Sequence, residues 1–295
     1  MKPARIGNLW MLVAGFFFAC MGALVKVGAE TLSSNELVFY RSLFGLITIT
    51  LMIFASRGAK SLRTPRWRLH ASRSVLGFIS LALYFYAITQ LPLATAITLN
   101  YTSPLFLAVL TLFYMPREAK PVLLLAIVVG FIGVALLLQP SFTQGTWIPA
   151  LMGLISGLLA GIVYVQVTQL GRMGEPEWRT VFYFTLVCTI GSGLWMLIHQ
   201  FHALSWQLLG LLSAMGACAT LAQLAMTRAY RKGDPLTAGS LAYSTVILSS
   251  LFGMLWWDES LAPAGWLGVA LIIASGIISL RGRAGFDKSA QAPTL

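Results

Sequence analysis

Residues 37–55 read LVFYRSLFGLITITLMIFA, a stretch in which Arg41 is the only charged residue. A helix of about 20 mostly apolar residues is long enough to cross the hydrocarbon core of a bilayer. The whole chain has this character, because 58% of its 295 residues are hydrophobic and only 10% are charged. Soluble domains contain about 25% charged residues. The composition therefore excludes a soluble enzyme, a disordered chain and a secreted disulfide scaffold.

Ten such stretches follow one another, and most of the breaks between them contain proline, glycine or charged residues. We therefore expect an all-α integral membrane protein with ten transmembrane helices. The expected spans are 8–28, 37–55, 74–89, 94–115, 122–138, 147–169, 181–198, 206–230, 236–257 and 265–280. The third is short, and a start nearer His70 is the alternative.

The basic residues predict the orientation of these spans. Eighteen of the 20 lysines and arginines lie in the N-terminal segment, after an even-numbered span, or in the C-terminal tail. Positive charge stays on the cytoplasmic side, so both termini are expected in the cytoplasm of a bacterial-type cell. The net charge of +11 is then an orientation signal, and no nucleic-acid partner is expected. The largest group follows the second span and consists of Arg57, Lys60, Arg63, Arg66, Arg68 and Arg73.

The chain also repeats itself at an offset of 143 residues. The sequence VFY at 38–40 recurs at 181–183, and Pro92-Leu93 recurs as Pro235-Leu236. Two repeats, 1–143 and 144–295, would hold five spans each, so the second repeat enters the membrane from the opposite side. Inverted repeats of this kind are typical of secondary transporters, in which the substrate site lies between the halves near the midplane. A duplicated scaffold without transport is the alternative.

Several of these sequence features are similar to a known family. They are ELVFYRS at 36–42, the turn LPLATA at 91–96, and Glu118 and Glu259 after the fourth and ninth spans. Together with ten spans and glycine-rich fifth and tenth spans, they resemble the EamA-type transporters of the drug/metabolite transporter superfamily. The resemblance implies a pocket lined mainly by spans one, three, four, six, eight and nine. It also implies an inner-membrane secondary transporter that exports amino acids or related small metabolites by alternating access.

Two basic residues lie within spans. A charge inside the membrane is costly and usually faces the protein interior or a cavity. Arg41 can therefore hold a substrate carboxylate in its bidentate fork, and an ion pair with Glu36 or Glu30 that closes the outer face is the alternative. Its repeat partner is Phe184, so the symmetry does not require a charge there. Lys26 is expected to pair with Glu30, with substrate contact as the alternative.

Uncharged polar residues interrupt the fourth and ninth spans at equivalent positions, as NYTSP at 100–104 and YST at 243–245. Proline leaves a backbone carbonyl without its helical donor. Two polar stretches in the same span of each repeat predict a midplane site, and interhelical hydrogen bonds are the alternative. The candidate substrate-binding residues are Arg41, Asn100, Tyr101, Ser103, Tyr243, Ser244, Tyr84, Tyr164 and Gln223.

Motifs for catalysis or cofactor binding are missing from the sequence. There is no phosphate-binding loop, GxSxG or HExxH, and Cys20, Cys188 and Cys218 lack ligand spacing. We therefore expect no enzymatic activity, no cofactor and no metal. No acidic residue falls at the centre of a span, which argues against proton-coupled export of cations.

The expected substrate is consequently an amino acid, a small carboxylate or a neutral metabolite. An uncoupled facilitator or exchanger, and a non-transporting membrane partner protein, are the alternatives. Glycines in the fifth and tenth spans fit a homodimer face or internal packing equally well.

Overall fold

The computed structural model describes residues 3–56, 62–103, 105–106, 109, 121–143, 145–199, 201–233, 235–259 and 261–289. The described part of the chain is helical and contains no β-strand. The helices are α1 (Pro3–Gly28), α2 (Ser34–Ser56), α3 (Trp67–Gln90), α4 (Leu93–Asn100), α6 (Pro121–Thr143), α7 (Trp147–Arg172), α8 (Glu177–Ile198), α9 (Trp206–Lys232), α10 (Pro235–Ala242), α11 (Ser244–Trp257) and α12 (Pro263–Ser289).

Six of the described helices, α1, α2, α3, α7, α8 and α9, are long and apolar enough to cross a membrane. Shorter apolar helices cover Ile127–Leu137, Ser244–Trp257 and Pro263–Ser275. Large apolar side chains such as Leu197, Ile198 and Trp206 project outward almost fully exposed. A soluble protein rarely exposes such a surface, so these side chains fit contact with lipid.

Several helices extend beyond the expected limits, and three of the differences bear on the site. The third span begins at Trp67 instead of residue 74, which moves Arg73 from the connection into the helix. The helix expected over 94–115 ends at Asn100, and most of the residues after it, including Glu118, lie outside the described residues. The ninth is split into α10 and α11 at Tyr243.

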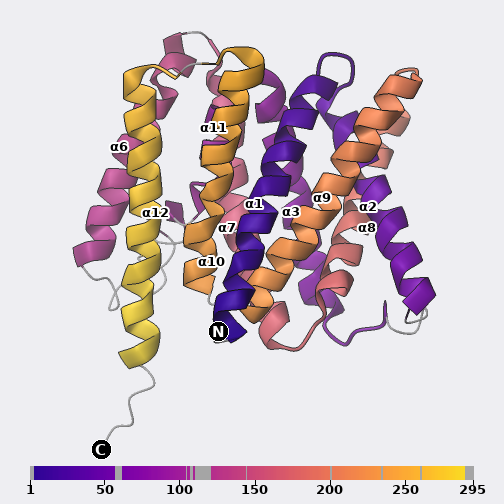
Figure 1. Ribbon diagram of the computed structural model, residues 1–295, viewed down its shortest axis with the longest axis horizontal. Coiled ribbons are helices and arrows are strands. Elements are labelled where there is room, and N and C mark those ends of the chain that lie inside the picture. The colour runs from indigo at the N-terminus through magenta and orange to yellow at the C-terminus, as the bar shows by residue number, and fades with distance from the viewer. Residues whose placement is uncertain are drawn as a thin grey trace, which may run out of the picture.

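The long helices stand side by side and cross the bundle in alternating directions (Figure 1). We call the end of the bundle at which α1 begins the N face, and the other end the distal face. The connection between α2 and α3 and the turn between α7 and α8 lie at the N face. The connections α1–α2, α3–α4, α8–α9 and α11–α12 lie at the distal face.

Helices far apart in sequence pack in matching pairs. Helix α1 packs on α9, and α7 packs on α3 in the same way. Helices α2 and α8 pack on each other, as do α4 and α11. Helices α6 and α12 form a pair at one side of the bundle (Figure 1), where Gly133 and Gly268 allow their backbones to approach closely.

Local sequence explains where several helices begin and end. Ser33 and Glu36 form a capping box at the start of α2: Ser33 donates N–H to the carboxylate over 2.9 Å, and Glu36 donates N–H to Ser33 Oγ over 3.3 Å. Gly174 turns the chain between α7 and α8 with a φ of 82°. Asp258 ends α11 in the left-handed conformation, with a φ of 49°. The turn at Asp258 directs Glu259 back toward the bundle.

Candidate functional site

A cavity lies in the middle of the bundle. The space inside it is about 600 Å³, its open side included. Phe18, Gly77 and Ala160 line it and lie near the midpoints of α1, α3 and α7, so the cavity is at mid-depth. The full lining is Phe18, Met21, Arg41, Arg73, Gly77, Ser80, Leu81, Tyr84, Asn100, Tyr101, Ala160, Val163, Tyr164, Phe184, Gln223 and Met226.

Two arginines give this cavity its charge. Arg41 comes from α2 and Arg73 from α3, and both side chains are buried. Their guanidinium carbons lie 5.3 Å and 4.1 Å from the ring centroid of Phe184, so both make cation–π contacts with one ring. Nε and Nη1 of each arginine have no hydrogen-bond partner among the described residues. The described lining residues include no carboxylate.

Arg73 is a charged cavity-lining residue that is not among the candidates from the sequence. It was counted with the basic connection after the second span, but it lies inside α3 and is 1% exposed. A periodic pattern could have identified it, because Arg73, Gly77, Ser80 and Tyr84 are spaced as neighbours on one helical face. All four of these residues line the cavity.

The end of α4 forms another wall. Asn100 donates from Nδ2 to Ser156 Oγ over 3.0 Å, and Tyr101 donates its hydroxyl to Thr245 Oγ1 over 3.0 Å. Gly157 of α7 makes this arrangement possible, since a Cβ there would lie 2.5 Å from the Leu99 carbonyl oxygen. The predicted candidates Asn100 and Tyr101 therefore line the cavity and also tie α4 to its neighbours.

The candidates in the ninth span lie behind this wall. Tyr243 stands at the break between α10 and α11, with its ring centroid 6.4 Å from that of Tyr101. Neither Tyr243 nor Ser244 is among the lining residues, although Tyr243 Oη and Ser244 Oγ are buried without a hydrogen-bond partner among the described residues. Ser103 is also buried and does not line the cavity. The two polar stretches meet as expected, but only the first faces the cavity.

The remaining uncharged candidates line the cavity. Tyr84 of α3 is buried there, whereas Tyr86 is exposed, in agreement with the opposite helix faces on which they lie. Tyr164 of α7 stacks on Tyr230 with ring centroids 5.5 Å apart. Gln223 of α9 is buried, and its Oε1 has no hydrogen-bond partner among the described residues.

The charged residues near the distal face have different partners from those expected. Lys26 forms an ion pair with Glu259, and not with Glu30, which is exposed and has no ion pair among the described residues. Glu36 does not pair with Arg41, because the capping box of α2 and His202 use its carboxylate. The Glu36 carboxylate accepts from the His202 N–H over 2.7 Å. The distal face is thus tied by contacts from α1 and α2 to the connections α11–α12 and α8–α9.

Glu259 adds a third contact at the distal face. Its carboxylate accepts from the N–H of Leu93 over 2.7 Å. That N–H belongs to the first turn of α4 and has no partner within the helix. Glu259 therefore connects the start of α4, the end of α1 and the connection after α11.

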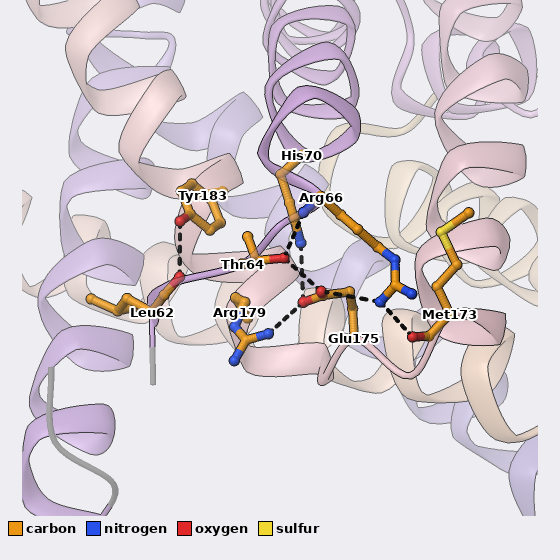
Figure 2. A network of polar contacts seen from close by, with 8 residues as sticks. All are labelled: Leu62, Thr64, Arg66, His70, Met173, Glu175, Arg179 and Tyr183. Atoms are coloured by element: carbon orange, nitrogen blue, oxygen red, sulfur yellow. Dashed lines mark hydrogen bonds and ion pairs between the residues drawn. The ribbon is translucent and has the colours of Figure 1, made fainter. Parts of the chain in front are cut away.

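The N face has its own network, centred on Glu175 (Figure 2). Thr64 donates its hydroxyl to Glu175 Oε1 over 2.6 Å, and Arg179 donates to Oε2 over 2.6 Å. His70 Nε2 lies 3.3 Å from Oε2. Arg66 donates to the Met173 carbonyl over 2.7 Å. The network joins the connection between α2 and α3 to the turn between α7 and α8.

The environment of Glu175 determines its charge. Burial raises the pKa of the Glu175 carboxyl, but the hydrogen bonds from Thr64 and Arg179 and the approach of His70 outweigh burial and hold this pKa below its usual value. Glu175 is therefore ionised at neutral pH. Nearby, Glu177 accepts from Arg228 over 3.0 Å and pairs with Arg231, which ties α8 to α9.

The described residues contain no group of three or more His, Cys, Asp or Glu side chains suited to hold a metal ion. His202, one of the two histidines between α8 and α9, instead contacts Glu36 through Nδ1 at 2.8 Å.

Comparisons with known proteins agree with this architecture. The model of the EamA-like transporter family matches residues 5–139 and again 147–281. The pseudopaline exporter CntI of Pseudomonas aeruginosa is 29% identical over 92% of this chain and 94% of its own length. A riboflavin transporter of Rhizobium johnstonii is 28% identical over 95% of this chain and 93% of its own length. An S-adenosylmethionine uptake transporter of Rickettsia felis is 22% identical over 92% of each chain.

A solved crystal structure has the same fold, with a TM-score of 0.68 over 94% of this chain and 97% of that one at 18% identity. The relatives are membrane transporters and not enzymes. The chain is thus a multi-pass membrane protein that belongs to the EamA-like transporter family, within the drug/metabolite transporter superfamily.

Proposed function

We propose that this protein is a secondary transporter of the bacterial inner membrane, built from ten spans in two inverted repeats, 1–143 and 144–295. Helices at equivalent positions support this proposal, because α1 runs away from the N face whereas α7 runs toward it (Figure 1). The matching pairs of helices support it as well, since the packing of α1 on α9 has a counterpart in the packing of α7 on α3. Helix α4 begins the fourth expected span of the first repeat, and α10 with α11 covers the equivalent span of the second.

The basic residues support an orientation with both termini in the cytoplasm. Arg66, Arg179, Arg228 and Arg231 all lie at the N face, which would then be the cytoplasmic face. Glu259, Glu36 and His202 lie at the opposite face.

Alternating access would require the ties at the two faces to break in turn. The Glu175 network joins the two proposed repeats at the N face, and the contacts of Glu259 and Glu36 join them at the distal face. The cavity lies between these two sets of contacts. Opening either set would expose the cavity to one side only, which is the requirement for a secondary transporter.

The buried Arg41 is the observation that carries the substrate assignment. A guanidinium without a carboxylate partner inside the membrane is expensive to keep, and its planar fork matches a carboxylate. The tyrosines, Phe184 and Gln223 around it offer stacking and hydrogen bonds. The substrate is accordingly an amino acid or a related small carboxylate. The direction, export, is taken from the family resemblance. An uncoupled facilitator or exchanger is the second candidate, since the described cavity lining holds no acid that could carry a proton.

Counterflow in proteoliposomes tests this function. Labelled amino acids, a dicarboxylate, a purine and an organic cation are offered with and without a pH gradient. Accumulation of an amino acid or carboxylate that disappears in Arg41→Ala, while the variant still inserts and purifies normally, is the expected result. Insensitivity to the pH gradient would favour the facilitator. Accumulation of the cation alone, or of nothing, would refute the carboxylate assignment.

A further inference from the structure

The positions of Arg41 and Arg73 define the substrate more closely. Both side chains are buried, and both guanidinium groups lie on the ring of Phe184. They can be no farther apart than the sum of their distances to that ring. We propose that the cavity binds a small organic substrate with two carboxylates, one held by each arginine, so that Arg73 determines specificity for a second anionic group.

The first argument is the unmet charge of the cavity. Each arginine has Nε and Nη1 without a hydrogen-bond partner among the described residues. Two cations in one cavity repel each other, and burial in a low-dielectric interior strengthens that repulsion. The Phe184 ring compensates for only part of this cost, because a cation–π contact supplies no hydrogen-bond acceptor. A ligand with one negative charge would leave one guanidinium uncompensated.

The second argument is that the protein's nearby acids are engaged elsewhere. Glu36, Glu175, Glu177 and Glu259 bind partners at the two faces of the bundle. None of them is among the lining residues of the cavity. Within the described chain, therefore, the acceptors that would neutralise Arg41 and Arg73 have to come from a ligand.

The third argument is the division of the cavity wall. Arg41 and Arg73 come from different helices, and each presents its own planar fork, which matches one carboxylate bidentately. The unpaired Gln223 Oε1 offers an acceptor on a third helix, α9, suited to an ammonium group. An acidic amino acid such as glutamate carries these three groups. This inference rests on the proposed function, since it names the substrate class of the same cavity.

Binding to the purified full-length protein in detergent tests the inference without transport. Each dicarboxylate is compared with the monoamide of the same shape: glutamate with glutamine, and succinate with succinamate. In the wild type each dicarboxylate should bind at least about tenfold more tightly than its monoamide, which corresponds to about 1.4 kcal/mol. In Arg73→Gln this preference should fall to less than about twofold. Arg68→Gln is the matched control, because Arg68 is exposed on the same helix and should leave the preference unchanged.

Arg73→Lys covers the case in which Arg73→Gln does not fold. It keeps the charge but loses the fork, so the preference should shrink and not disappear. Equal binding of dicarboxylate and monoamide by the wild type, or a preference that survives in Arg73→Gln, would overturn the inference. Tighter binding of O-phosphoserine than of glutamate would overturn the assignment of the second group as a carboxylate. In either case, counterflow of a neutral amino acid would still support the proposed transport function, although the dicarboxylate inference had failed.

Discussion

Replacing Glu175 with glutamine should open the N face. The change keeps the shape of the side chain but removes its negative charge. The Glu175 carboxylate accepts a hydrogen bond from Thr64 over 2.6 Å and lies 3.3 Å from His70. Both partners belong to the other proposed repeat. Hydrogen bonds to charged groups contribute about 1.5–3 kcal/mol and neutral ones about 0.5–1.5 kcal/mol. Two weakened contacts therefore cost the closed N face about 2 kcal/mol, which shifts the equilibrium toward the open form roughly thirtyfold.

The assay is labelling of a cysteine in the cavity by an impermeant maleimide added from the N-face side. Ala160 is the position of choice, because it is small and lines the cavity. Cys20, Cys188 and Cys218 are first replaced by alanine. The labelling rate of Ala160→Cys should rise by roughly ten- to thirtyfold when Glu175→Gln is added, provided that opening is fast relative to labelling.

Glu177→Gln is the matched control. Glu177 lies two residues away and pairs with Arg228 and Arg231 of α9, which belong to the same proposed repeat as α8. Breaking these contacts removes comparable charge-assisted bonds but unties no contact between the repeats. Labelling in Glu177→Gln should therefore stay within about twofold of the parent. An equal increase in both variants, or no increase in Glu175→Gln, would refute the assignment of the Glu175 network as a gate.

Three further outcomes are expected from the same structure. The pKa of Glu175 is lowered in the folded protein. The contribution of Glu175 to N-face closure is therefore present above the ordinary glutamate pKa and is lost as pH falls through the pKa of the folded state. The difference in labelling between the parent and Glu175→Gln should accordingly persist from roughly pH 8 to pH 5. Gly157→Ala should lower the melting temperature in detergent, because a Cβ there would lie 2.5 Å from a backbone carbonyl of α4, whereas Gly210→Ala, with nothing within 4 Å, should not. Glu259→Gln should increase labelling of the cavity cysteine from the distal face, because it releases Lys26; unchanged labelling there would exclude Glu259 as a distal tie.

The membrane fold could be predicted from the sequence because length and apolar composition report it directly. Helix limits do not follow as directly from composition, and the difference at the start of α3 has the largest consequence. An arginine near a span boundary is read as part of a basic connection, because hydropathy averages over many residues and ignores direction. Arg73 lies inside α3 instead, in a helix that begins at Trp67. Its place on one face with Gly77, Ser80 and Tyr84 was visible only through helical periodicity.

The ion pairs could not be predicted in the same way. The expected pair of Lys26 with Glu30 follows from spacing along one helix, but α1 ends at Gly28, before Glu30. The observed partner, Glu259, is brought near by the left-handed turn at Asp258 and by the packing of α11 against α1. Contacts of this kind depend on tertiary arrangement, which short-range spacing does not report. The alternative for Arg41, an ion pair with Glu36 or Glu30, also overlooks local structure, because the sequence SSNE at 33–36 already contains the capping box that uses the Glu36 carboxylate.

The proposed repeat relation places the cavity close to the two-fold axis that would relate the two halves. Arg41 and Phe184 occupy equivalent positions 143 residues apart, and the structure brings them into contact, with 5.3 Å between the guanidinium carbon and the ring centroid. Tyr101 follows α4 and Tyr243 follows α10, one position from strict equivalence under this offset, and their rings are neighbours as well. Residues related by a two-fold axis contact each other only close to that axis. The proposed two-fold axis would therefore pass close to the cavity, near the contact between Arg41 and Phe184.

The charge of the cavity does not follow this symmetry. Under the same offset Arg41 corresponds to Phe184 and Arg73 to Gly216, so the first half supplies both cations and the second half supplies the ring on which they lie. A symmetric scaffold gives both faces the same means of opening, because exchanging the conformations of the halves exchanges the open side. The substrate instead meets a site with one cationic wall. Under the proposed mechanism, exchange between the two conformations can be nearly balanced, while a substrate of the proposed class would keep its carboxylates on the first repeat whichever face is open.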